Sequence, residues 1–201
     1  MDSTHLNTTA DWPDEPMALF NQWLDHVRAE GVPEPEAMAL CSTTADGKPS
    51  ARMVLLRGLD ENGFSFYTNY ESRKGQELIA NPHAAAIFYW RDPYLQVRIE
   101  GEVEKLTPEE SDAYFNSRER AKRVSASVSQ QSRPIKDFRE IEAAAGTLLS
   151  SEDEIARPSH WGGFRIKPTR IEFWAGTQTR MHRRCVYTQA GDNWERELLA
   201  P

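Results

Sequence analysis

Short apolar runs separated by polar turn residues fill residues 37–106 of the chain. The runs are rich in branched and aromatic residues, and turn pairs such as Asp46-Gly47 and Asn62-Gly63 separate them, a pattern that predicts strands. Strands that follow one another so closely favour an antiparallel sheet or barrel over a doubly wound sheet. The predicted strands cover residues 37–44, 50–59, 64–69, 84–90 and 96–106.

Helical spacing and capping residues predict four helices along the chain. From Gly162 the sequence returns to strand-like segments, with a turn at 190–193, so periodicity alone indicates an α+β fold. The predicted helices are one that carries Phe20, Trp23, Leu24 and Val27 and ends near Gly31, one from the N-cap Ser72 to about Asn81, one that opens at the capping box Thr107-Pro108-Glu109-Glu110, and one over about 137–150.

The length of 201 residues fits one large domain, and a hydrophobic content of 39% is enough for a core. Residues 1–16 are polar, contain prolines and lack periodicity, which predicts a flexible N-terminal arm before a single domain over 17–201. The first residues lack the basic and apolar regions of a signal peptide, and the longest apolar run is too short to cross a bilayer. The expected location is therefore the cytoplasm.

The formal net charge of −7 and the lack of a long basic tract argue against a nucleic-acid partner. Cys41 and Cys185 lie far apart without ligand spacing, so buried thiols are expected rather than a disulfide. His5, His26, His83 and His160 show no ligand spacing either, and no metal site is expected. The cations of the chain are clustered locally, which suits a small anionic ligand.

Four of these cations surround two apolar segments and a predicted helix start. Arg52 and Arg57 flank the apolar run 53–56, while Arg73 and Lys74 lie on the first turn of the second predicted helix. The free N–H groups of that turn, the positive end of the helix dipole and the two cationic side chains together suit a phosphate. For this pair alone, a solvated position on an exposed turn is the alternative.

Further motifs follow in order along the chain. They are Arg52-Met53-Val54-Leu55-Leu56-Arg57, Tyr67-Thr68, Ser72-Arg73-Lys74-Gly75, Gln96-Val97-Arg98, Tyr114-Phe115, Ser117-Arg118, Ser129-Gln130-Gln131-Ser132, Trp161-Gly162-Gly163-Phe164, Glu172-Phe173-Trp174, Arg180-Met181-His182 and Leu199-Ala200-Pro201. Each motif is weak alone. Their succession, from about residue 20 to residue 201, closely resembles the pyridoxine (pyridoxamine) 5′-phosphate oxidase family.

The resemblance implies an antiparallel split β-barrel with peripheral helices, assembled as a homodimer with flavin mononucleotide (FMN) at each of two interface sites. No G-x-G-x-x-G turn and no P-loop occurs in the sequence, which favours a mononucleotide flavin over a dinucleotide. Some of the implied contacts come from the other subunit. The residues that match cofactor-binding positions are Arg52, Met53, Val54, Leu55, Leu56, Arg57, Tyr67, Thr68, Arg73, Lys74, Gln96, Gln131, Ser132, Trp174 and Arg184.

The resemblance also implies a substrate site, in which Arg180 and His182 form an R-x-H motif over the substrate ring and orient its C4′ carbon for hydride transfer to the flavin N5 atom. Alternation on an extended segment predicts that Arg180, His182 and Arg184 share one face. Taken alone, His182 would more often be a structural histidine. The residues that match substrate-binding positions are Arg57, Tyr114, Arg118, Lys122, Arg180, Met181 and His182.

The chain departs from the family pattern on the substrate side. Arg57 replaces the usual lysine, Lys122 the usual serine and Arg183 the usual acidic residue. The N-terminal arm also lacks the usual pair of an arginine and a tyrosine, since the first arginine of the chain is Arg28. A planar guanidinium and a compact ammonium are not equivalent at a shaped anion site. The site stays cationic, so an anionic substrate is still expected.

Three functional hypotheses follow. The first is an FMN-dependent oxidase that converts pyridoxine 5′-phosphate or pyridoxamine 5′-phosphate to pyridoxal 5′-phosphate, with molecular oxygen as acceptor and hydrogen peroxide as product. The second is a related flavin oxidase for another anionic ring, as in the phenazine pathway. The third is a flavin- or pyridoxal-phosphate-binding protein without turnover. Arg180 and His182 argue against the third hypothesis, whereas Arg57 and Lys122 keep the second open.

Overall fold

One antiparallel sheet forms the body of the protein in the computed structural model, which describes residue 9 and residues 12–201. The predicted antiparallel α+β architecture is confirmed. Across the sheet the strands are β2 (Pro49–Leu55), β1 (Ala37–Thr43), β5 (His83–Trp90), β6 (Leu95–Lys105), β7 (Trp161–Ala175), β4 (Gly63–Asn69) and β3 (Gly58–Asp60), while β8 (Arg183–Ala190) pairs with β7 and with β9 (Asn193–Leu199).

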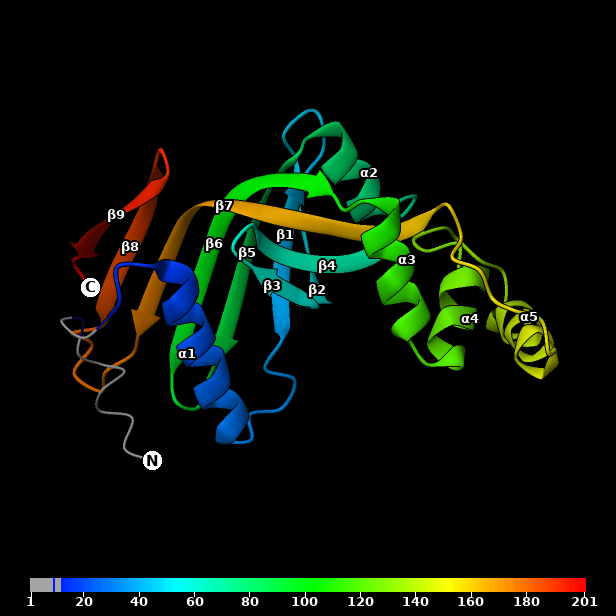
Figure 1. Cartoon of the computed structure of the whole chain (residues 1–201), viewed down its shortest axis with the longest axis horizontal. Helices are drawn as coiled ribbons and strands as arrows, with labels where there is room; N and C mark the ends of the chain where they lie inside the picture. Colours follow the sequence, from blue (N-terminus) through cyan, green and yellow to red (C-terminus); the bar gives the residue numbers. More distant parts are fainter. Residues whose placement is uncertain (1–8, 10–11) are drawn as a thin grey trace.

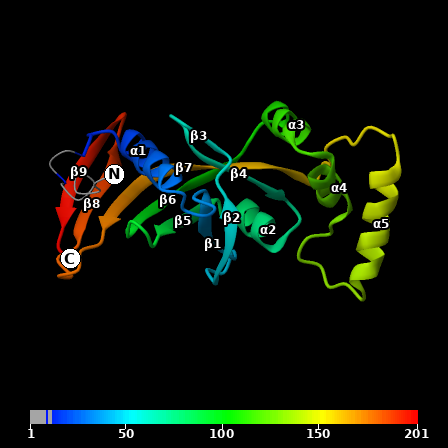
Figure 2. The same ribbon diagram turned by 90° about the horizontal axis from the view of Figure 1, so that it is seen from below.

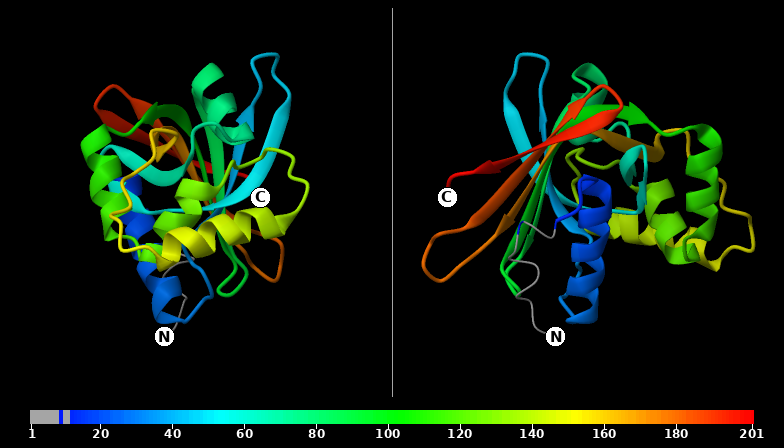
Figure 3. Two further views of the ribbon diagram at one scale, coloured as in Figure 1. Left: turned by 90° about the vertical axis from the view of Figure 1, so that its right-hand side faces the viewer. Right: turned by 60° about the vertical axis from the view of Figure 1, so that its left-hand side comes forward.

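The longest of these strands, β7, divides the sheet. One of its edges pairs with β6, and the other pairs first with β4, over 161–166, and then with β8, over 170–175. β2 and β3 stand at the two ends of the main strand order, and only two residues of the chain separate them. In this link the Arg57 N–H donates to the carbonyl of Ser65 on β4 at 2.8 Å. The sheet therefore curls into a partly open barrel (Figure 3).

Helices cover this sheet and extend it at one end. α1 (Pro16–Ala29) packs on the sheet with its buried face, and α2 (Arg73–Ala80) joins β4 to β5. The remaining helices gather at the end of the molecule opposite β8 and β9 (Figures 1 and 2). These are α3 (Pro108–Ser117), α4 (Arg120–Val128) and α5 (Phe138–Ser150).

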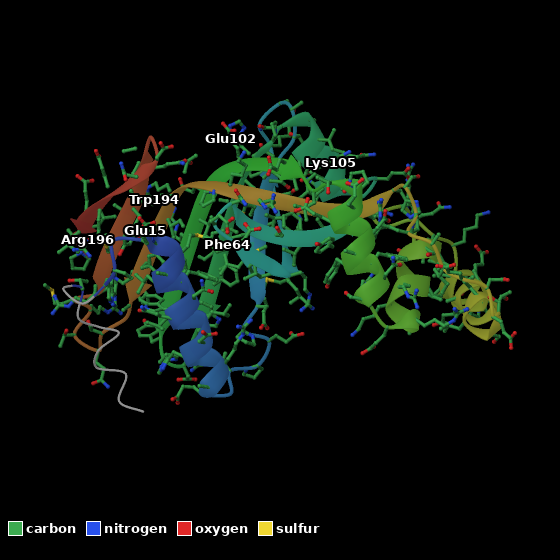
Figure 4. The ribbon with its side chains drawn as sticks, viewed as in Figure 1. Glu15, Phe64, Glu102, Lys105, Trp194 and Arg196 are labelled. Carbon is green, nitrogen blue, oxygen red and sulfur yellow. The ribbon has the colours of Figure 1, made fainter. Side chains whose placement is uncertain are left out.

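Aromatic side chains fill the core between α1 and the sheet. Phe20 meets Phe64 and Phe88 edge to face, with ring centroids 4.9 and 5.0 Å apart, and Trp23 meets Phe173 at 5.1 Å. All five side chains have no exposed surface. Phe64 lies between α1 and the sheet in Figure 4. Edge-to-face contacts of this kind add to the free energy gained from burial alone.

The predicted flexible arm, residues 1–16, falls mostly on residues 1–8, 10 and 11, which lie outside the described part of the chain. Within the arm, Trp12 is buried and its ring centroid lies 5.4 Å from that of Trp23. Arg196 on β9 (Figure 4) donates to the Trp12 carbonyl, and the Tyr187 hydroxyl donates to the Pro13 carbonyl at 2.7 Å. Contacts with the domain therefore begin before residue 17.

The predicted strand over 50–59 is wrong as one element. It breaks into β2 and β3 because the chain leaves one end of the strand order at Leu55 and joins the other at Gly58. Cys185 is buried as expected, whereas Cys41 is only half-buried, and both thiols are free. Within the described residues, no helix is long and apolar enough to span a membrane. The cytoplasmic location stays a prediction.

Substitution of Gly75 tests the close approach between the start of α2 and the end of β4. A Cβ atom at this position would overlap the Tyr70 carbonyl oxygen and lie 2.7 Å from that of Asn69. We expect Gly75→Ala to destabilise the protein by about 1–3 kcal/mol because backbone must shift. The control Gly146→Ala, in the middle of α5 with open space around it, should stabilise by about 0.5–1 kcal/mol. Thermal unfolding followed by circular dichroism measures both, and an unchanged midpoint for Gly75→Ala would contradict the packing.

Candidate functional site

A cavity of about 460 Å³ lies between β2, β4, α2, α3 and the loop that follows α4. We call it the cationic cavity, because four cationic side chains line it. Ser117, Glu119 and Trp161 also line it, although the sequence predicts no role for them. Of the predicted site residues, the cavity brings together Met53, Val54, Leu55, Arg57, Tyr67, Thr68, Lys74, Tyr114, Arg118, Lys122 and Gln131.

The ammonium group of Lys74 lies at the end of this cavity near α2. It donates hydrogen bonds to Thr68 Oγ1 and Gln131 Oε1 at 2.8 Å each, and to Ser72 Oγ at 3.3 Å. Burial, together with the positive charge of Arg52, lowers the pKa of Lys74 to about 8. All the acceptors in these hydrogen bonds are neutral oxygens, so the charge of the ammonium is left for an anionic ligand to balance.

Local sequence explains why Lys74 sits there. Ser72 caps α2, because its side chain accepts from the Gly75 N–H at 3.3 Å, and this places Lys74 on the first helical turn as predicted. The same turn presents free backbone N–H groups and the positive end of the helix dipole. Helix, side chain and cap therefore favour a negative charge at one point.

Behind this point lies a buried carboxylate, Glu77, in the second turn of α2. Ser42 Oγ and Ser50 Oγ donate to its Oε2 at 2.6 and 2.5 Å. Arg52 Nη2 donates to the same oxygen at 3.0 Å, and Arg73 Nε donates to Oε1 at 2.8 Å. Burial acts to raise the pKa of Glu77, but these four hydrogen bonds outweigh it and lower the pKa to about 2. We call these five residues the Glu77 cluster.

Arg52 is therefore held by the protein itself. It donates from Nη1 to the Leu40 carbonyl at 3.1 Å and to Ser42 Oγ at 2.6 Å, and from Nη2 to Ser50 Oγ and Glu77. Four of its five N–H donors are thereby used. Seven predicted cofactor residues lie outside the set that lines the cationic cavity in the described chain: Arg52, Leu56, Arg73, Gln96, Ser132, Trp174 and Arg184.

Three parallel aromatic rings form the opposite wall. Tyr67 stacks on Tyr114 with centroids 3.8 Å apart and an interplanar angle of 15°, and Trp161 stacks on Tyr67 at 5.6 Å. The Arg118 guanidinium lies over the Trp161 ring at 4.8 Å. Burial, with a smaller contribution from Glu110, raises the pKa of Tyr67 to about 12, so its phenol stays neutral at physiological pH.

Arg118 supplies a second sign that an anion belongs here. Burial lowers the pKa of its guanidinium, and its Nη1 atom is buried with no hydrogen-bond partner among the described residues. A buried donor without an acceptor costs roughly 1–3 kcal/mol. Arg118 follows the last residue of α3 in extended conformation, so it is not on the helix that carries Tyr114, yet both residues line the cavity.

The other predicted residues gather at the opposite end of β7. Gln96 and Arg184 are the register partners of Trp174 on its two sides, and the His182 ring lies 4.6 Å from the Trp174 ring. Arg184 donates to the buried Glu172 carboxylate at 2.8–2.9 Å and to the Ala200 carbonyl at 2.9 Å. We call Gln96, Trp174, His182 and Arg184 the Trp174 cluster.

The predicted shared face of Arg180, His182 and Arg184 on one extended segment is wrong. Arg180 has a φ of 62° and donates its N–H to the Thr177 carbonyl at 3.1 Å, so this part of the chain turns. His182 accepts from the Thr177 N–H through Nδ1 at 3.2 Å, and β8 begins only at Arg183. Arg180 and Met181 are exposed, and His182 is half-buried.

One chain does not bring the two groups together. Trp161, the first residue of β7, lines the cationic cavity, and Trp174 lies thirteen residues later on the same strand. At about 3.3 Å per residue, a strand covers up to about 40 Å over that length. Figures 1 and 2 show β8 and the α3–α5 region at opposite ends of the molecule. Each chain therefore carries two separate groups of predicted site residues.

The Glu77 cluster makes a prediction about acid stability. The pKa of Glu77 in the folded chain, about 2, lies below its ordinary value of 4.5. Its contribution to stability is therefore complete above about pH 4.5 and is lost as the pH falls towards 2, and its size is at most about 3 kcal/mol. Glu77→Gln should lose less stability than the wild type between pH 4.5 and 2 in urea unfolding experiments. Equal pH slopes for the two proteins would contradict the assignment.

Comparison of sequences gives two matches that together cover most of the chain. Residues 24–150 match the family described as pyridoxamine 5′-phosphate oxidase, and residues 161–201 match the pyridoxine 5′-phosphate oxidase C-terminal dimerisation region. A pyridoxine/pyridoxamine 5′-phosphate oxidase of Pseudomonas paraeruginosa is 50% identical over 196 residues, which cover 96% of this chain and 91% of the relative. One of Salinibacter ruber is 48% identical over 194 residues, covering 94% and 90%.

Two solved structures resemble the whole chain. PhzG from Burkholderia lata 383, in complex with tetrahydrophenazine-1-carboxylic acid, has a TM-score of 0.93 and 34% identity, and the match covers 96% of this chain and 95% of PhzG. An FMN-binding protein from Nostoc punctiforme, related to pyridoxamine 5′-phosphate oxidase, has a TM-score of 0.77 and 18% identity over 94% of this chain and 100% of its own. The second likeness concerns the fold alone, and with the curled sheet it confirms the predicted split barrel.

Proposed function

The chain belongs to the pyridoxamine 5′-phosphate oxidase family, and on that premise we propose that it is an FMN-dependent oxidase of pyridoxine 5′-phosphate and pyridoxamine 5′-phosphate. The product is pyridoxal 5′-phosphate, and molecular oxygen is reduced to hydrogen peroxide. The observation that carries the proposal is the cationic cavity, in which the half-buried side chains of Lys74 and Arg118 have no carboxylate partner in the described chain. Two separate half-buried cations suit two phosphates, one on the cofactor and one on the substrate.

The residues near α2 fit the phosphate of FMN. Lys74 has only neutral acceptors, and Gln131 and Thr68 lie within hydrogen-bond distance of its ammonium group. Arg73, on the same helical turn, keeps its side chain largely exposed. These residues would hold the phosphate, while the exposed Met53 and the cavity wall of β2 would lie along the flavin. When bound, the flavin supplies a two-electron acceptor at its N5 atom.

The residues near α3 fit the phosphate of the substrate. Arg118, Arg57 and Lys122 supply positive charge, and Tyr114 supplies both a hydroxyl group and a ring face. Lys122 also pairs with Glu119 at 3.3 Å, and both groups are well exposed, so an anion can compete for this ammonium. Binding at this end would fix the substrate ring along the stack of Tyr67, Tyr114 and Trp161.

A second copy of the chain completes the site. The Trp174 cluster lies within residues 161–201, the part of the chain that matches a dimerisation region, and it lies at the opposite end of β7 from the cavity. In a homodimer, the Trp174 cluster of one protomer would face the cationic cavity of its partner. Arg180 and His182 would then orient the C4′ carbon of the substrate, and this orientation is the main contribution of the protein to the rate.

A related activity on another anionic ring is the second candidate. The likeness to PhzG over nearly the whole chain favours it, as do Arg57 and Lys122, since both of these departures from the family pattern line the cavity. Arg183, the third departure, is exposed at the start of β8. Substrate choice is therefore the part of the function that an experiment must decide.

Anaerobic mixing of the flavin-loaded protein with pyridoxine 5′-phosphate tests the reaction. We expect the flavin absorbance to bleach and to recover when air is admitted, with one hydrogen peroxide formed per turnover. Pyridoxine without its phosphate is the control and should reduce the flavin far more slowly, because it lacks the group that Arg118 and Lys122 bind. Bleaching by tetrahydrophenazine-1-carboxylic acid alone would favour the second candidate. Tightly bound flavin that no substrate reduces would favour a binding protein.

Mixed dimers test whether two chains share each site. Lys74→Ala should lose the cofactor phosphate contact and His182→Ala the substrate orientation, so each homodimer should be nearly inactive. A heterodimer of the two variants still contains one site with both residues intact. Co-expression in equal amounts should therefore restore roughly a quarter of the wild-type activity. A co-expressed mixture as inactive as its components, despite heterodimers detected by mass spectrometry, would contradict a shared site.

A further inference from the structure

None of the five residues of the Glu77 cluster lines the cationic cavity in the described chain, yet Arg73 directly precedes the cavity residue Lys74 on the first turn of α2. Glu77 is 5% exposed and binds two arginines from two different elements, Arg52 from β2 and Arg73 from α2. Its remaining hydrogen bonds come from the Ser42 and Ser50 hydroxyl groups. The carboxylate therefore has no free position for a ligand and acts only through its neighbours.

The two arginines differ in what this contact leaves free. Arg52 has one unused N–H donor, because both of its Nη groups are engaged within the described chain. Arg73 contributes only Nε to the hydrogen bonds found among the described residues, so its four Nη hydrogens stay available. A guanidinium anchored at Nε can still offer both Nη groups to an anion in the paired geometry that phosphate oxygens accept.

Anchoring matters because Arg73 is otherwise a mobile side chain. Its side chain is 63% exposed, and a free arginine loses about 2 kcal/mol of rotamer entropy when a ligand fixes it. The contact with Glu77 is an i, i+4 pair on α2, so the helix itself sets the distance between the two groups. Part of the cost of ordering Arg73 is therefore met before the ligand arrives.

We propose that Glu77 is a positioning residue for the flavin phosphate, which holds Arg73 and Arg52 beside Lys74 and thereby selects FMN over riboflavin, its dephosphorylated form. The inference rests on the proposed function, because it takes the flavin phosphate to bind at Lys74. The sum of charges agrees with it. Arg52, Arg73 and Lys74 carry three positive charges and Glu77 one negative charge, so the net charge of +2 matches a phosphate dianion. The low pKa of Glu77 keeps its carboxylate ionised throughout the physiological range.

Flavin titration of the apoprotein tests the proposal without any catalytic readout. FMN and riboflavin are each titrated into wild type and Glu77→Gln, and binding is followed by quenching of flavin fluorescence. We expect Glu77→Gln to weaken FMN binding by about tenfold and to leave riboflavin binding unchanged. Repulsion between Glu77 and the phosphate is the opposing idea, and it predicts equal or tighter FMN binding in the variant. That result would overturn the proposal.

Three further variants separate positioning from a general effect on folding. Glu104→Gln is the matched control, because Glu104 also binds two cations, Arg165 and Lys167, but does not line the cationic cavity, and it should leave both affinities unchanged. Arg73→Lys keeps the charge and loses the Nε contact, so it should weaken FMN binding selectively even if Glu77→Gln fails to fold. In an Arg73→Ala background, Glu77→Gln should weaken FMN binding by a smaller factor than it does in the wild type.

The possible failures are distinguishable. A wild-type protein that binds FMN no better than riboflavin would contradict the phosphate site itself, and with it the proposed function. A wild-type protein that prefers FMN, together with Glu77→Gln and Arg73→Lys variants that keep the full preference, would overturn only the role of Glu77. An equal loss of FMN and riboflavin binding in Glu77→Gln would show a structural role and would also overturn the proposal.

Discussion

The pairing of β7 with two different strands along one edge is the constraint on which the rest of the structure depends. β4 occupies the first part of that edge and β8 the last, so the strand joins the barrel to the β8–β9 hairpin. Trp161 and Trp174 sit near its two ends and belong to different groups of site residues. A single chain therefore builds both groups but does not bring them around one ligand, and for this reason the proposed site needs a second copy of the chain.

Beside each of these groups, a buried carboxylate holds arginine side chains in place. Glu77 and Glu172 are both buried carboxylates that bind arginines. Glu77 binds Arg52 and Arg73, and Glu172 binds Arg98, Arg170 and Arg184. Removing a charge from water is costly unless it is paired and hydrogen-bonded, and here the pairing comes from neighbouring strands and helices. Lys74, which has only neutral acceptors, and Arg118, whose Nη1 atom has no partner among the described residues, line the cavity, where an anion can satisfy them.

Local patterns predicted most of the fold because caps, turns and alternation act over a few residues. The capping box at Thr107 and the N-cap at Ser72 have the predicted hydrogen bonds. α4 was not predicted, since Val124 is its only fully buried residue and most of its other side chains are charged or small.

The candidate site was less predictable, because tertiary contacts decide how its residues are used. Family motifs identified most of the residues that line the cavity, but the contacts of Arg52 with Glu77 and two serines join residues distant in sequence. The turn at Arg180 opposes the alternation expected of that segment. The contact of Trp12 with Phe173 likewise joins positions far apart along the chain. The separation of the two groups of site residues depends on the length of β7, which motifs alone do not reveal.

The anchoring of Trp12 has a dynamic consequence. β9 pairs only with β8, and the contacts of Arg196 and Tyr187 with residues 12 and 13 fasten this hairpin to the core. Segments that are far apart in sequence then open together, and the amide hydrogens of β9 gain slow exchange from a tryptophan at the other end of the chain.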